Sequence, residues 1–65
     1  METLQKIKEL VELMSTDAQK VFNKGNRSAS IRARKHAQEI KNLCGTLRKE
    51  LLEEVKKYGG DVSED

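Results

Sequence analysis

The residues best suited to chemistry in this 65-residue chain are four basic side chains that recur every seven positions. They are Arg27, Arg34, Lys41 and Arg48. Seven residues of an α-helix fall about 20° short of two full turns, so the four would stay within a sector of about 60° on one helix face. Their stripe would be about 32 Å long. Guanidinium and ammonium groups spaced in this way can bind the phosphates of a polyanion.

The net charge of +2 conceals an uneven distribution along the chain. Residues 1–22 carry three basic and four acidic groups (−1), residues 23–49 carry eight basic and one acidic (+7), and residues 50–65 carry two basic and six acidic (−4). A solvated helix face, the plainer interpretation, normally intersperses acidic residues, whereas only Glu39 interrupts this basic block. The pattern therefore favours binding of a polyanion.

The candidate phosphate ligands are the eight basic residues of segment 23–49: Lys24, Arg27, Arg32, Arg34, Lys35, Lys41, Arg48 and Lys49. Duplex DNA carries one charge per about 1.7 Å of its axis, so binding by these residues would depend on salt and hardly on sequence. Gly45 falls on the same sector of the helix as the stripe, at a cost of about 1 kcal/mol relative to alanine. A row of cations interrupted by a residue without a side chain would let the backbone of a polyanion lie close to the helix.

Apolar residues at alternating spacings of three and four predict two helices that position these cations. The first helix is expected over about residues 3–23, with an apolar series formed by Leu4, Ile7, Val11, Met14, Ala18 and Val21. Thr16 and Gln19 fit a capping box that would start a new helix there, but the series continues in phase, which favours an unbroken helix.

The second helix is expected over about residues 27–58, with an apolar series formed by Ala29, Ala33, Ala37, Ile40, Cys44, Leu47, Leu51, Val55 and Tyr58. Gly25 suits the left-handed conformation that ends a helix, and Asn26 suits the cap of the next one. A tight reversal between the two helices follows. The fold class is therefore all-α, an antiparallel helical hairpin with the basic stripe about 90° around the second helix from its apolar series.

Two helices of unequal length cover only one side of each other, and a domain this small rarely gains more than about 3–5 kcal/mol from its core. Within one chain, cover is lacking for four leucines: Leu10, Leu13, Leu43 and Leu52. We therefore expect a homo-oligomer, a dimer or higher assembly of hairpins that forms a four-helix bundle. Residues 1–58 would form the single domain and residues 59–65 a flexible acidic tail that could fold over the basic stripe.

Several function classes are not expected. No apolar run exceeds three residues, which argues against a membrane span, and the single Cys44 indicates a reducing, cytoplasmic compartment. One histidine, one cysteine and no room for a pocket argue against an enzyme, and neither a cofactor nor a metal is expected. His36 is expected on the surface, Cys44 in the apolar series, and Tyr58 at the closed end of the bundle.

The run from Lys24 to Lys35 resembles the small bacterial linker-histone-like nucleoid proteins, the family of the chlamydial histone-like protein. That family has the run K-G-N-K-A-A, then an R-x-R-K step, then a leucine-spaced helix with a second R-K, which appears here as Arg48-Lys49. Residues that match directly are Lys24, Gly25, Asn26, Ala29, Arg32, Arg34, Lys35, Arg48 and Lys49. Arg27 and Lys41 match in charge. The resemblance covers about residues 4–58.

The resemblance implies a helical hairpin that binds and helps condense DNA in the nucleoid. The chlamydial protein continues into a long tail rich in lysine and alanine, whereas residues 59–65 here are acidic, so any binding is expected from the folded stripe. Two alternatives stay open from the residues alone: a structural or adaptor hairpin that docks an acidic protein, and RNA in place of DNA. No aromatic pair is present for base stacking.

Overall fold

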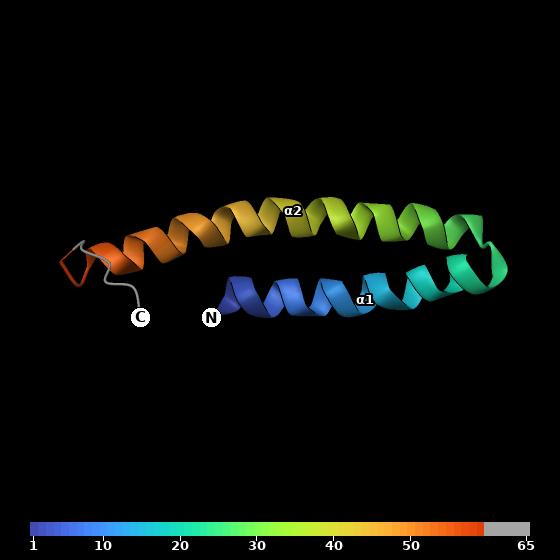
Figure 1. Cartoon of the computed structure of the whole chain (residues 1–65), viewed down its shortest axis with the longest axis horizontal. Coiled ribbons are helices and arrows are strands. Elements are labelled where there is room, and N and C mark those ends of the chain that lie inside the picture. The colour runs from blue at the N-terminus through green and yellow to red at the C-terminus, as the bar shows by residue number, and fades with distance from the viewer. Residues whose placement is uncertain (60–65) are drawn as a thin grey trace.

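The computed structural model describes residues 1–59 and consists of two helices, α1 (Glu2–Lys24) and α2 (Arg27–Lys56). They fold back on each other as an antiparallel hairpin with extents of 51 × 21 × 14 Å (Figure 1). The predicted hairpin is confirmed, with helix ends within two residues of those expected. Residues 60–65, most of the predicted acidic tail, lie outside the described residues.

The reversal uses the two residues expected to make it. Gly25 adopts φ 64° and ψ 30°, the left-handed conformation that glycine enters without strain, and its N–H donates to the Val21 carbonyl at 2.8 Å. This is the 5→1 bond of an αL cap, and the Asn26 N–H also reaches the Lys20 carbonyl at 3.4 Å. The Asn26 side chain then accepts from the Ala29 N–H at 3.0 Å and caps α2.

The face of α1 that packs on α2 is only partly the predicted one. Ile7, Met14, Ala18 and Val21 are half-buried, as expected, and α1 runs unbroken through residues 15–17. Leu4 and Val11 are exposed instead of packed, which corrects the prediction. Three neighbours take their place on the packing face of α1: Thr3, Leu10 and Asp17.

The face of α2 is shifted in the same way. Ala29 is fully buried, and Ala33, Ile40, Leu47 and Val55 are half-buried as predicted. The other four members of the predicted series are exposed, and those expectations were wrong: Ala37, Cys44, Leu51 and Tyr58. His36 and Leu43 occupy the packing face instead, so the predicted surface position of His36 was wrong as well.

Both corrections have one physical cause. The observed packing faces are rotated by about 40° from the predicted ones on each helix, because spacings of three and four residues fit two adjacent lines along a helix. The line through Leu10 contains Asp17, and the line through Leu43 contains His36. Because Asp17 and His36 are polar, the neighbouring lines of apolar residues were predicted to be the packing faces. In the structure the two polar side chains face each other across the helix interface.

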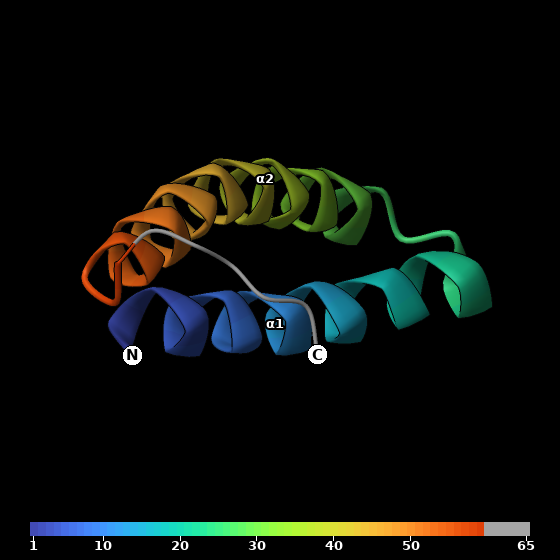
Figure 2. The same cartoon turned by 60° about the vertical axis from the view of Figure 1, so that its left-hand side comes forward.

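The hairpin covers little of its own apolar surface. Leu10 and Ala29 are the buried hydrophobic residues within residues 1–59, and Leu43 is half-buried, so these two leucines find more cover than expected. Leu13 and Leu52 stay exposed, as predicted. The end of α2 extends beyond the N-terminus of α1 (Figure 1), and Figure 2 shows from another side that the two helices run next to each other.

Candidate nucleic-acid interface

The heptad stripe lies on the side of α2 that faces away from α1. Arg27, Arg34, Lys41 and Arg48 are all exposed. Measured from the observed packing face, they lie about 100–160° around the helix, further out than the 90° expected from the sequence. None of the four is required for packing against α1, so all four side chains are free to meet a ligand.

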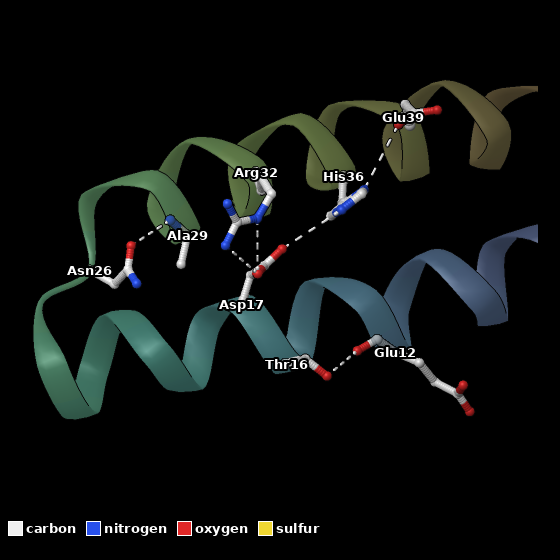
Figure 3. A network of polar contacts seen from close by, with 8 residues as sticks. All are labelled: Glu12, Thr16, Asp17, Asn26, Ala29, Arg32, His36 and Glu39. Carbon is white, nitrogen blue, oxygen red and sulfur yellow. Dashed lines mark hydrogen bonds and ion pairs between the residues drawn. The ribbon is translucent and has the colours of Figure 1, made fainter.

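Arg32 differs from the other candidate ligands because it joins the two helices. Its Nε donates to Asp17 Oδ1 at 3.2 Å, and its Nη2 lies 3.2 Å from the same oxygen (Figure 3). Its side chain is 48% exposed, whereas Asp17 as a residue is only 7% exposed. A guanidinium held in this way neutralises the buried carboxylate of Asp17, so it is less available to a phosphate. Arg32 is therefore primarily a structural residue of the hairpin.

His36 completes this polar cluster from the next turn of α2. Its Nε2 lies 3.8 Å from Asp17 Oδ2, and its Nδ1 lies 3.9 Å from Glu39 Oε1 (Figure 3). Both distances exceed a hydrogen bond, and Nδ1 is buried with no hydrogen-bond partner. This cluster was not predicted from the sequence. The signal available was that Asp17 continues the heptad line of Thr3 and Leu10, at a spacing that points it into the interface.

The other candidate ligands carry no counter-charge within the hairpin. Among the described residues 1–59, no carboxylate lies within ion-pair distance of seven of the eight: Lys24, Arg27, Arg34, Lys35, Lys41, Arg48 and Lys49. The end of α2 behaves differently, because Lys56 pairs with Glu53 at 3.8 Å and Lys57 with Glu54 at 3.0 Å. Uncompensated positive charge thus stops where the acidic part of α2 begins.

Lys24 belongs to α1 and lies in its last turn, next to Gly25. A cation there interacts favourably with the helix macrodipole. The basic surface therefore begins on α1, crosses the reversal to Arg27 and continues along α2. The tight turn brings the end of one helix and the start of the other into a single stretch of positive charge.

Two shallow depressions mark the outer side of α2. The first is lined by Ile31, Arg34, Lys35 and Gln38. The second is lined by Gly45, Arg48, Lys49 and Leu52. The two sets of positions are related by a shift of 14 residues, and each places an Arg-Lys pair between uncharged residues. At Gly45 an added Cβ would meet no atom within 4 Å, so the helix backbone itself forms an open floor.

Neither helix has an apolar stretch of the kind that crosses a membrane. Within residues 1–59 there is also no group of three or more His, Cys, Asp or Glu side chains arranged to bind a metal ion. The arrangement offers charge, supplied by exposed guanidinium and ammonium groups on a rigid helix. Such an arrangement is chemically suited to the binding of anions.

Comparison with known proteins agrees with this chemistry. Searches of curated proteins and of solved structures returned no match. The model of the family described as histone H1-like protein Hc1 matches residues 1–57, which include both helices and all eight candidate ligands. This confirms the resemblance seen in the run from Lys24 to Lys35, and it suggests a DNA-binding protein of the nucleoid, a packaging rather than an enzymatic role. The chain belongs to the histone H1-like protein Hc1 family.

Proposed function

We propose that this protein binds duplex DNA without reading its sequence, through phosphate contacts made by the exposed cations of α2 and the reversal. The observation that supports this most strongly is the set of seven exposed cations with no carboxylate within ion-pair distance among residues 1–59. Contacts from Arg and Lys to phosphate position a protein on DNA but carry no sequence information. Family membership supports DNA as the polyanion.

Three of the four stripe residues are arginines, which suits this role. A guanidinium can donate two parallel hydrogen bonds to one phosphate, and it keeps its charge at any physiological pH. Lys41, the fourth, acts as a point charge. On this proposal Arg32 contributes least of the eight, because Asp17 already occupies its guanidinium.

We further propose that the protein works as a homo-oligomer, in which one hairpin covers the apolar side of another. Five exposed apolar residues lie about 40–95° from the packing faces, on the same side of the hairpin. They are Leu4, Val11, Ala37, Cys44 and Leu51. A second hairpin packed there would give a four-helix bundle and double the number of cations that one assembly presents to DNA. Such an assembly could help organise DNA in the nucleoid. Sedimentation tests this proposal, and a stable monomer at micromolar concentration would contradict it.

Charge reversal on α2 tests the DNA-binding surface. We expect the double variant Arg34→Glu and Lys41→Glu to lose retention of a 30-base-pair duplex in a mobility-shift assay, with unchanged helix content by circular dichroism. The matched control is Lys8→Glu with Lys20→Glu, which changes the net charge equally on exposed positions of α1. Equal loss in both variants would contradict binding through α2. The same duplex made of RNA, and an acidic polypeptide, should bind more weakly than DNA; tighter binding of either would contradict DNA as the ligand.

A further inference from the structure

The outer side of α2 carries an adjacent Arg-Lys pair between two uncharged residues twice, 14 positions apart. We call the depression at Ile31, Arg34, Lys35 and Gln38 the first cradle, and the depression at Gly45, Arg48, Lys49 and Leu52 the second cradle. In each, adjacent Arg and Lys residues diverge by about 100° around the helix. The uncharged residues three before and four after the arginine form a floor between them. A phosphate seated on that floor would have a cation on either side.

The separation of the cradles follows from the shift of 14 residues. Fourteen residues rise about 21 Å along a helix and turn it to within about 40° of its starting direction. Both cradles therefore lie on the same side of α2, about 21 Å apart along the helix. The spacing is several times the distance between neighbouring phosphates of one DNA strand, which rise about 3.4 Å per base pair. Neighbouring phosphates of a single DNA strand are therefore too close together to occupy both cradles.

The segment between the cradles has a different character. From the inner edge of the first cradle to that of the second, the outward residues are Gln38, Asn42 and Gly45, with Lys41 to one side. From Gln38 to Gly45, the inner edges of the two cradles, the helix rises about 10 Å, and from one cradle centre to the other it rises about 21 Å; the opening of the major groove, about 12 Å wide, lies between these two distances. The minor groove, about 6 Å wide, is too narrow for a helix to span in this way. Amide side chains over the opening and cations over its rims match a helix that lies across the major groove.

We propose, building on the proposed DNA binding, that α2 lies across the major groove of duplex DNA and that the two cradles hold phosphates of the two strands that bound it. Ile31 and Leu52 then lie against the sugars beside those phosphates, which accounts for exposed apolar side chains among the cations. Gly45 lets the backbone of α2 approach the rim of the groove. This arrangement accounts for a glycine in the middle of a helix, where glycine is otherwise unfavourable.

Paired neutralising variants of the full chain test the two cradles. Arg34→Gln with Lys35→Gln removes the charge of the first cradle, and Arg48→Gln with Lys49→Gln removes that of the second. We expect each to lower the slope of log K against log salt for a 30-base-pair duplex by about 1.8, the value for two phosphate contacts, and to leave helix content unchanged. Lys8→Gln with Lys20→Gln, the matched control on α1, should leave the slope unchanged. Unequal effects of the two cradle variants, or a control with the same effect, would overturn the proposal.

Blocking one groove at a time tests which groove α2 crosses. We expect wild-type protein to lose binding to a duplex whose cytosines carry glucosylated hydroxymethyl groups in the major groove. Netropsin, bound in the minor groove of an A·T-rich duplex, should not displace the protein. Displacement by netropsin, or unchanged binding to the glucosylated duplex, would overturn the crossing of the major groove. Failure of the proposed DNA binding itself would look different, because the wild type would not bind the unmodified duplex at all.

Discussion

Replacing Asp17 by alanine tests how the two helices are held in register. The carboxylate accepts from Arg32 Nε at 3.2 Å, and Asp17 is only 7% exposed in the middle of a largely apolar packing face. A single polar residue in such a position specifies how helices align. The variant Asp17→Ala removes the acceptor and leaves the Arg32 guanidinium and the His36 ring facing a small apolar side chain.

The expected loss of stability follows from the exposure of each partner. A hydrogen bond to a charged group contributes about 1.5–3 kcal/mol when buried, whereas an exposed ion pair contributes about 0–1 kcal/mol. Arg32 is 48% exposed, so its interaction with Asp17 belongs between these limits. The His36 contact at 3.8 Å is too long to add a hydrogen bond. We expect Asp17→Ala to lower the free energy of unfolding by about 1–2 kcal/mol.

Thermal unfolding followed by circular dichroism measures this loss. For a domain of this size 1 kcal/mol corresponds to about 4–8 °C in Tm, so the shift should be well resolved. The variants Arg32→Ala and Asp17→Ala with Arg32→Ala complete a double-mutant cycle, in which the coupling between the two residues should be about 1 kcal/mol. An unchanged Tm for Asp17→Ala, or a coupling of zero, would refute the role assigned to this pair.

Three further predictions concern single residues. Gly45→Ala should raise the free energy of unfolding by about 1 kcal/mol in thermal melts, because an added Cβ meets open space and alanine favours the helix; a lower Tm would mean that this face is covered. Leu10→Ala should cost about 2–3 kcal/mol in urea unfolding, whereas Phe22→Ala, at a side chain 87% exposed, should stay within about 0.5 kcal/mol; similar losses would contradict the packing face. Cys44 should react with a thiol reagent in dilute native protein and become protected as the concentration rises, and protection at every concentration would contradict its exposure in the hairpin.

The local features of the fold could be predicted because they depend on neighbouring residues. Gly25 and Asn26 carry the chemistry of the reversal in their own backbone and side chain, so the turn and both helix ends at it were predictable. The end of α2 was less so, since Lys57 and Tyr58, which were expected in the helix, belong to a turn. Tyr58, which was expected to close the end of the bundle, is 83% exposed.

The packing face could not be predicted fully, because it depends on a pairing between distant residues. In the sequence, Asp17 and His36 each have the polarity of a surface residue. They can lie in the interface because Asp17 faces both His36 and Arg32 there. The same pairing explains the candidate site. Charge density identified the eight basic residues, but only the position of Asp17 separates Arg32 from the rest. Arg34, Lys35, Arg48 and Lys49 were predicted as candidate ligands, and the structure adds that the two Arg-Lys pairs line separate depressions on the outer side of α2.

The salt dependence of duplex binding tests the proposed function most directly. Wild-type protein is titrated with one 30-base-pair duplex by fluorescence anisotropy at several salt concentrations, and log K is plotted against log salt. About four to six phosphate contacts from the exposed cations predict a slope of roughly −4 to −5, with similar affinity for an unrelated sequence. No binding at low salt, or a slope near zero, would contradict phosphate recognition by α2.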